Sequence, residues 1–124
     1  MIFRLKTSKR TMEIYDDLAK RVNLQPFALA KLSIALSLKG DVESLKFDTD
    51  TNGLDLNKQT ITGKYDVMFK CLIEMHCGDH LKDEDYFPKY VKAHIDRGAK
   101  MLYNEFRFSK DFISYLAGLE GEAI

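Results

Sequence analysis

The chain has 124 residues, in which 19 lysine and arginine side chains balance 19 aspartate and glutamate side chains. This length predicts a single domain over residues 1–124, large enough to bury a core without disulfides or metals. The zero net charge argues against a simple nucleic-acid-binding polycation, and no apolar run approaches the ~18 residues of a membrane helix. Because the N-terminal residues lack the apolar core of a signal peptide, we expect a cytoplasmic protein.

The N-terminal residues read as a strand followed by a helix. Residues 2–6 alternate between apolar and basic side chains, which is typical of a half-buried strand with Arg4 and Lys6 facing outward. A helix is predicted next, because Thr7 or Ser8 can cap it and apolar residues then recur at helical spacing. The predicted apolar face of this helix comprises Met12, Tyr15, Leu18, Ala19 and Val22.

A second helix is predicted from Pro26 to Lys39, since proline suits the first turn of a helix. Besides Lys39, only Lys31, Ser33 and Ser37 are polar in this segment. A helix that is apolar on nearly all sides must be buried on nearly all sides. We therefore favour burial in a subunit interface over burial in the chain's own core, and we expect a homo-oligomer.

The middle of the chain is less regular. The polar segment after the second helix has weak strand character and predicts a loose hairpin, with strands near residues 45–47 and 60–62. A third helix is predicted from Tyr65 to Met75 or His76. Its predicted inward face comprises Val67, Met68, Cys71, Leu72 and Met75.

Two further helices complete the prediction. The first opens at Pro88, with Val91, Ile95, Ala99, Leu102 and Phe106 on its inward face and Lys89, Lys92, Asp96 and Lys100 on the other. The last is capped by Ser109 and carries Phe112, Ile113, Leu116 and Leu119. The fold class is therefore mainly α: a compact helical domain with a short N-terminal strand and a small β-hairpin or loop connection.

Two segments carry residue types that bind metals. The segment Asp48 to Asn52, followed by Gly53, matches the opening of a calcium loop, but Gln59 stands where the bidentate glutamate is required, so a tight turn is favoured. Zinc ligand types occur at Cys71, His76, Cys77 and His80, but their spacing matches neither a zinc ribbon nor a zinc finger. On one helix the two cysteines would lie about 9 Å apart, too far for a disulfide. We expect neither a metal nor another cofactor.

The start of the chain has the order of ribbon-helix-helix DNA-binding proteins. In these proteins, strands of two chains pair into a ribbon that enters a DNA groove, and the second helices are buried in the dimer. The free amides of Leu24, Gln25 and Phe27 could then hold a phosphate. Residues 1–46 carry nine cations and five carboxylates, which makes this the basic part of the chain. The alternative is that the strand pairs with the later hairpin of the same chain.

The whole chain resembles the DndE family of the bacterial DNA phosphorothioation (Dnd) system, in which sulfur replaces a non-bridging phosphate oxygen of DNA. The resemblance rests on FRLKTSK at the start, PFALAKLSIALSL in the second helix, and NGLDLNKQTITGKYDVMFKCLI leading into the third. It implies a subunit that binds duplex DNA, prefers nicked duplex and forms a tetramer. It also implies partner proteins, namely a cysteine desulfurase, an iron–sulfur protein and an ATPase.

Together these observations predict a DNA-binding subunit that is not an enzyme, because the chain has no Gly-rich phosphate loop, G-x-S-x-G or H-E-x-x-H motif. The predicted contacts to the DNA backbone come from Arg4, Lys6, Lys9, Arg10, Lys20, Arg21 and Lys31. One alternative is a scaffold subunit of the same modification complex that does not touch DNA. Another, less favoured, is a small metal-dependent enzyme built on Cys71, His76 and His80.

Overall fold

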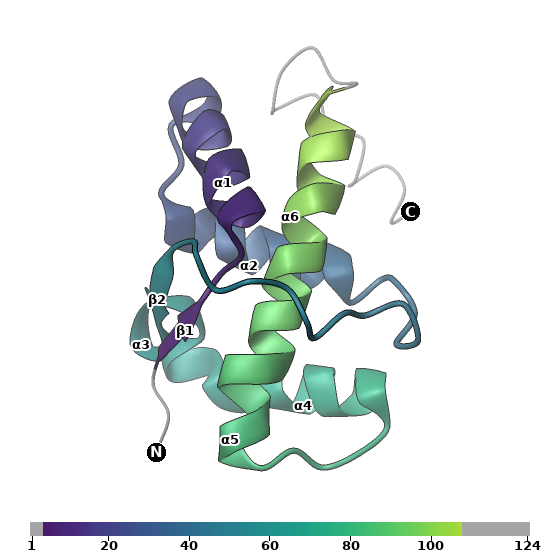
Figure 1. The fold of residues 1–124 in the computed structure, drawn as a ribbon. Helices are drawn as coiled ribbons and strands as arrows, with labels where there is room; N and C mark the ends of the chain where they lie inside the picture. Colours follow the sequence, from purple (N-terminus) through teal and green to yellow (C-terminus); the bar gives the residue numbers. More distant parts are fainter. Residues whose placement is uncertain (1–3, 108–124) are drawn as a thin grey trace, which may run out of the picture.

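The computed structural model describes residues 4–107, and Figure 1 shows their arrangement. The elements in chain order are β1 (Arg4–Lys6), α1 (Lys9–Val22), α2 (Pro26–Ser37), β2 (Asp55–Asn57), α3 (Lys58–Ile61), the 3₁₀ helix η1 (Gly63–Tyr65), α4 (Asp66–Cys77), α5 (Asp83–Asp85), the π-helical turn η2 (Tyr86–Val91) and α6 (Lys92–Arg107). The predicted mainly α fold with a short N-terminal strand is confirmed. The predicted helix after Ser109 lies outside the described residues.

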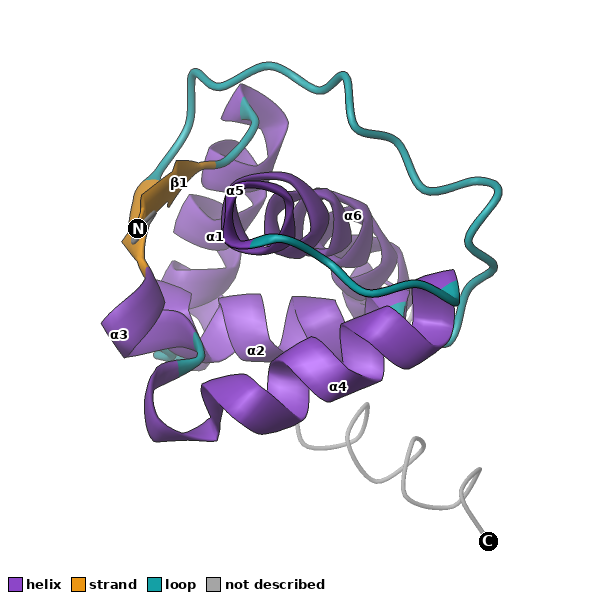
Figure 2. Cartoon of the chain, turned by 90° about the horizontal axis from the view of Figure 1, so that it is seen from below, coloured by secondary structure: helices purple, strands orange, loops and turns teal. Residues whose placement is uncertain are grey.

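Helix α6 runs through the middle of the molecule. Viewed along α6, β1 and the long connection of residues 38–54 lie on one side of it, while α2 and α4 lie on the other (Figure 2). The inward face predicted for this part of the chain is confirmed: Val91 at the end of η2 and Ile95, Ala99, Leu102 and Phe106 of α6 are all buried. No helix in the described part of the chain is long and apolar enough to cross a membrane.

Helix α2 is buried by its own chain rather than left for a partner. Leu29, Ala30 and Ile34 are completely buried in the core, which they share with α6. The two helices nearly touch at Gly98, where an added Cβ would lie 1.8 Å from the carbonyl oxygen of Ser33. The buried stripe of α2 therefore needs no subunit interface, because α6 supplies its apolar partner, whereas Phe27 on the same helix is 40% exposed. The homo-oligomer stays a prediction.

The predicted hairpin is wrong. Strand β1 pairs antiparallel with β2, and the buried pair Leu5 and Leu56 faces the core. Residues 45–47 form no strand, while Thr60 and Ile61 belong to α3, which Asn57 caps by accepting a 2.7 Å hydrogen bond at its N-terminus. The strand–helix–helix order is present, but β1 has a partner within the chain, as the alternative to the ribbon-helix-helix arrangement requires.

Helix α4 forms where it was predicted, but the face that was predicted to be inward is exposed to solvent. Val67, Met68, Leu72 and Met75 are exposed by 76, 51, 41 and 78%, and Cys71 is exposed as well. The core instead receives the other apolar stripe of the helix, through the buried Ile73 and the half-buried Phe69. The sequence of α4 contains two apolar stripes, and periodicity alone does not say which one the rest of the chain covers. We call residues 67, 68, 71, 72 and 75 the α4 apolar face.

Candidate nucleic-acid interface

A buried carboxylate holds together the segments that carry most of the candidate DNA-binding residues. Oδ1 of Asp96 accepts hydrogen bonds from the Ser8 amide (3.0 Å) and the Thr11 hydroxyl (2.7 Å). Its Oδ2 accepts from the Thr49 hydroxyl and the Lys92 ammonium, both at 2.7 Å. These four bonds use about the full acceptor capacity of a carboxylate. They join the start of α1, the connection of residues 38–54 and α6.

This result corrects the sequence reading of α6, which placed Lys92 and Asp96 on a solvent face. Their side chains are only 9 and 2% exposed, and their ion pair measures 2.7 Å. The connection of residues 38–54 covers them, through Thr49 in particular. A long polar segment far away in the sequence thus converts an outward helix face into a buried one. The helical periodicity of the sequence does not indicate that residues 38–54 cover this face of α6.

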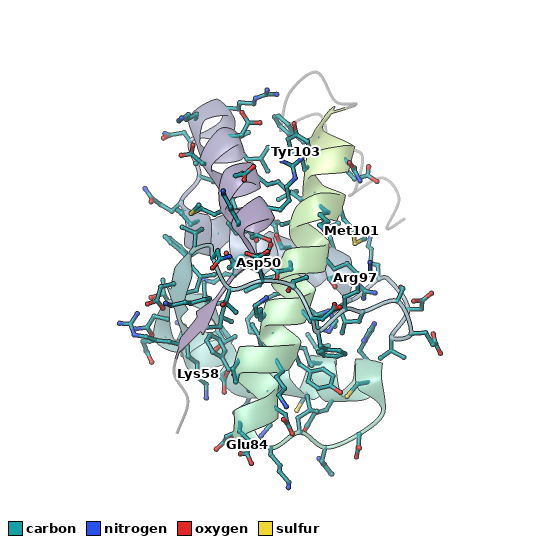
Figure 3. All side chains as sticks on the ribbon, viewed as in Figure 1. Asp50, Lys58, Glu84, Arg97, Met101 and Tyr103 are labelled. Atoms are coloured by element: carbon teal, nitrogen blue, oxygen red, sulfur yellow. The ribbon has the colours of Figure 1, made fainter. Side chains whose placement is uncertain are left out.

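The same connection is fixed to the junction between β1 and α1. The Gly53 amide donates to the Thr7 carbonyl at 2.9 Å, and an added Cβ at Gly53 would lie 2.1 Å from the Ser8 carbonyl oxygen, so only glycine fits. The carboxylate of Asp50, labelled in Figure 3, accepts from the amides of Lys9 and Asn52, and these bonds hold the pKa of Asp50 below its ordinary value. The segment considered as a calcium loop is therefore a turn that closes on α1.

The seven predicted DNA-binding cations divide into two groups. Four of them make exposed ion pairs, which are Arg4–Asp55 at 3.4 Å, Arg10–Glu13 at 3.7 Å, Lys20–Asp16 at 3.2 Å and Arg21–Asp17 at 3.4 Å. Within residues 4–107, Lys6, Lys9 and Lys31 make no ion pair with a carboxylate. Exposed pairs stabilise a protein by about 0–1 kcal/mol, so an incoming phosphate can replace such a carboxylate at small cost.

The predicted residues do not form one continuous patch. Lys9 and Arg21 lie near opposite ends of α1, about 18 Å apart at 1.5 Å per residue. The solvent side of α1 also carries three carboxylates against its four cations, so its net charge is only +1. Arg10 additionally lies over the ring of Tyr103, 5.3 Å from its centroid, which fixes its direction. The N-terminal basic surplus is thus spread over the surface and largely balanced locally.

A second cationic region, which the sequence analysis did not predict, lies between residues 38–54 and α6. A cleft of about 210 Å³ between residues 38–54 and α6 is lined by Ser44, Lys46, Thr49, Asp96, Arg97 and Lys100, among others. Neither Lys46 nor Lys100 makes an ion pair within the described residues. The sequence predicts Lys46 in a strand and Lys100 on a solvent face, and only the connection of residues 38–54 brings them together. We call this the Lys46–Lys100 cleft.

Arg97 closes one wall of the cleft and holds the end of α2. It donates to the Ser37 hydroxyl (2.8 Å), the Ser37 carbonyl (2.5 Å) and the Asp41 carbonyl (2.6 Å). Figure 3 shows its side chain between α6 and the neighbouring connection. Burial lowers the pKa of the guanidinium from its ordinary value, and the Asp41 carboxylate partly counteracts that effect. Arg97 is therefore a structural cation whose charge also acts on the cleft.

Two histidine rings, those of His76 and His94, are in contact near Arg97. The rings of His94 and His76 lie 5.0 Å apart, with His94 Nδ1 2.7 Å from the Ser37 hydroxyl and His76 Nε2 2.7 Å from the Gly40 carbonyl. A carbonyl only accepts, so His76 donates from Nε2. The remaining nitrogens, His94 Nε2 and His76 Nδ1, are buried and have no hydrogen-bond partner among residues 4–107. Burial, together with the nearby His76 and Arg97, lowers the pKa of His94 to about 3, so His94 is neutral in the folded protein.

The four residues considered for zinc do not converge. Cys71 is exposed on α4, His76 faces the Gly40 carbonyl, and the Cys77 thiol points to the carbonyls of Glu74 and Asp79. His80 is almost fully exposed, with its Nδ1 3.4 Å from the Glu74 carboxylate. Within residues 4–107, no group of three or more His, Cys, Asp or Glu side chains is arranged to hold a metal ion.

Comparison with known proteins identifies the family. The model of the family described as DNA sulphur modification protein DndE matches residues 4–110. The chain belongs to the DndE family. A crystal structure of DndE from Escherichia coli B7A, involved in DNA phosphorothioation modification, has a TM-score of 0.65 and 19% identity, covering 82% of this chain and 97% of that one.

A second solved DndE structure agrees with the first. It is a G21/24K mutant involved in DNA phosphorothioation, with a TM-score of 0.63 and 21% identity, covering 84% of this chain and 99% of that one. At these identities the two structures establish the DndE fold for this chain and no more. No curated protein sequence matches significantly. Family membership therefore rests on the family model, and the two crystal structures confirm the fold.

Proposed function

We propose that this DndE-family chain is the DNA-binding, non-catalytic subunit of a DNA phosphorothioation system, and that it binds nicked duplex more tightly than intact duplex. The observation that carries this proposal is the family match over residues 4–110. Its partners would be the other Dnd components, which we expect to be a cysteine desulfurase, an iron–sulfur protein and an ATPase in the cytoplasm. In this division of labour the chain positions DNA, and its partners supply the sulfur chemistry.

The surface cations support DNA binding. Lys6 and Lys9 lie on β1 and at the start of α1, and the hydrogen bonds to Asp96 join that junction to α6. Phosphate contacts of this kind position DNA without reading its sequence. A nick lowers the cost of bending because one strand is interrupted, so a surface whose cations are spread over several elements gains more contacts from a nicked duplex.

The α4 apolar face supports homo-oligomerisation, and we propose that its occupant is a second copy of this chain. Full burial of a Val, Leu or Met side chain contributes about 1.5–3 kcal/mol, which this chain leaves unused at four large residues of α4. An antiparallel pair of α4 helices centred between Cys71 and Leu72 would place Met68 opposite Met75. The same pairing places the exposed Lys64 opposite the exposed Asp79. This pairing thus brings apolar residues of α4 together and opposite charges near its two ends.

A tetramer of dihedral symmetry needs more than one kind of interface, and α4 would supply one of them. Light scattering tests this directly: Leu72→Glu is expected to lower the molar mass of the assembly. Phe27→Glu, at a 40% exposed position on α2, is the matched control and is expected to leave it unchanged. In Cys77→Ser protein, oxidation is expected to link Cys71 to its symmetry mate. An assembly that survives Leu72→Glu but is lost in Phe27→Glu would contradict the α4 interface.

The DNA-binding proposal is tested with matched intact and nicked duplexes at two salt concentrations. Wild-type protein is expected to prefer the nicked duplex and to bind more weakly at high salt, because binding releases counterions. Lys6→Glu/Lys9→Glu is expected to weaken binding to both duplexes. It should also reduce the slope of log affinity against log salt by about 1 for each lost phosphate contact.

The control for this experiment is Lys82→Glu/Lys89→Glu, which changes the net charge equally near α5, away from α1 in Figure 1. This control is expected to keep nearly wild-type affinity. Equal weakening in both variants would show that only net charge matters and would reject the proposed surface. If the intact oligomer bound neither duplex, the chain would instead be a scaffold subunit.

A further inference from the structure

The Lys46–Lys100 cleft has the charge of an anion site. Its two lysines, Lys46 and Lys100, have no carboxylate partner within the described residues. Arg97 adds a third positive charge, since its recorded acceptors are neutral carbonyl and hydroxyl groups. Each lysine ammonium brings three N–H donors that can turn toward a bound oxygen. The cleft therefore offers both charge and donors.

The carboxylates that line the cleft or bond to its lining residues, Asp96 and Asp41, are already engaged, while Glu43 and Asp48 of the same connection are not among the lining residues. Asp96 contributes to its wall, but the four donors described above saturate its oxygens, and its ion pair with Lys92 balances its charge. Asp41 hydrogen-bonds to Ser44 through its carboxylate, and this interaction holds the pKa of Asp41 below its ordinary value. Asp41 offsets part of the charge of Arg97. Lys46 and Lys100 are therefore the cations that remain for a ligand.

The cleft is large enough only for a small chemical group. Pockets for drug-sized molecules measure about 300–1,000 Å³, and this cleft, at about 210 Å³, is smaller. A backbone phosphodiester carries one charge and is flanked by sugars on both sides, so it presents fewer acceptor oxygens to a small recess. A terminal phosphate monoester protrudes from the strand, carries about −1.5 to −2 charges at pH 7 and presents three acceptor oxygens. The cleft matches the second group better than the first.

We propose that the Lys46–Lys100 cleft binds the terminal phosphate at a strand break in duplex DNA. This proposal rests on the proposed DNA-binding function and adds a residue-level reason for a preference for nicked duplex. The connection of residues 38–54 is joined to the junction carrying Lys6 and Lys9 through the Gly53–Thr7 and Asp50–Lys9 hydrogen bonds. One duplex can therefore contact the backbone-binding lysines and place a broken end in the cleft.

The test compares nicked duplexes that differ only at the break, with a 5′-phosphate, a 3′-phosphate or hydroxyls on both sides, together with the intact duplex. For the wild-type oligomer we expect one phosphorylated nick to bind roughly tenfold tighter than the hydroxyl nick, as for charge-assisted hydrogen bonds. Lys46→Gln/Lys100→Gln is expected to lose this difference and to bind the intact duplex like wild type. Lys82→Gln/Lys89→Gln serves as the matched control and should keep the difference.

The possible failures are distinguishable. Equal binding of phosphorylated and hydroxyl nicks overturns the cleft proposal but leaves the DNA-binding function intact, and so does a phosphate preference that survives in Lys46→Gln/Lys100→Gln. Absence of binding to every duplex overturns the DNA-binding function and the cleft proposal with it. A competition arm adds inorganic phosphate at constant ionic strength. If inorganic phosphate shifts the NMR signals of cleft residues while no phosphorylated nick gains affinity, the cleft is a site for free anions only.

Discussion

The buried histidine His94 predicts that this protein loses stability in mild acid. Its side chain is completely buried, and its pKa falls to about 3 in the folded protein from an ordinary value of 6.5. Between these two values the unfolded chain binds a proton at this position and the folded chain does not. Stability from this group is therefore fully present above pH 6.5 and decreases as the pH falls toward 3.

The magnitude follows from the two pKa values. At pH 5.0 the unfolded histidine gains about 2 kcal/mol from protonation, while the folded one, with a pKa near 3, gains almost nothing. The free energy of unfolding should therefore fall by about 2 kcal/mol between pH 7.5 and 5.0, with a slope approaching 1.4 kcal/mol per pH unit at the lower end. For a chain of this length, that loss lowers Tm by roughly 5–10 °C.

Urea denaturation at several pH values between 7.5 and 5.0 measures this effect. The pKa values of the carboxyl groups of Asp41, Asp50 and Glu74 are also lowered, by hydrogen bonds, but these groups titrate below this window. His94→Asn keeps a group able to bond to the Ser37 hydroxyl and removes the titration. This variant should be less stable at pH 7.5 yet lack about 2 kcal/mol of the acid-induced loss. Parallel pH profiles for the two proteins would refute the reasoning.

Three substitutions probe the packing around the candidate site by chemical denaturation. Gly98→Ala, usually favourable in a helix, should here destabilise by about 1–3 kcal/mol, because its Cβ would overlap the Ser33 carbonyl; a more stable variant would contradict the close approach. Asp96→Ala should lower the free energy of unfolding by about 3–5 kcal/mol, because it leaves Lys92 buried without its partner. The double variant Asp96→Ala/Lys92→Met should recover part of that loss. Ser8→Ala should cost about 0.5–2 kcal/mol through loss of the N-cap of α1, and an unchanged stability would show that the cap contributes nothing.

The helices could be predicted because their signals are local. Ser8 caps α1 by accepting from an amide in the first turn, Pro26 opens α2, and Gly78 ends α4 with a positive φ of 78°. Each of these signals concerns residues within a few positions of one another, which is the range over which sequence patterns are informative. The buried stripe of α6 was predicted correctly for the same reason.

The wrong predictions all concern which segment packs against a given helix or strand. Local sequence patterns do not contain that information. Helix α4 has two apolar stripes, and the chain buries the one with Ile73 instead of the one with Leu72. Helix α2 was assigned to a partner because nothing in the sequence showed that α6 would cover it. The sequence does not show that β1 pairs with β2 of the same chain, because β2 is only three residues long and has no alternating pattern of useful length. These outcomes depend on contacts between residues far apart in sequence.

The candidate site shows the same limit. The seven predicted cations are exposed or near the surface as expected, yet the sequence could not show that four of them face carboxylates one helical turn away or across the β1–β2 pair. It also could not place Lys46 beside Lys100, because these residues are 54 positions apart and meet only when the connection folds over α6. Charge counts along a chain indicate which segment is basic, whereas a binding site depends on which cations remain unpaired after folding.

Asp96 provides the physical link between the fold and this site. A buried ion pair is weak evidence for stability, since well-packed apolar residues in its place often stabilise a protein as much or more. Apolar residues, however, form no directional bonds, and here four bonds to one carboxylate fix the start of α1, Thr49 and Lys92 relative to each other. The positions of Lys9, Lys46 and Lys100 depend on those segments. We therefore infer that the main contribution of Asp96 is to hold three cationic segments in register, which is what a phosphate-binding surface requires.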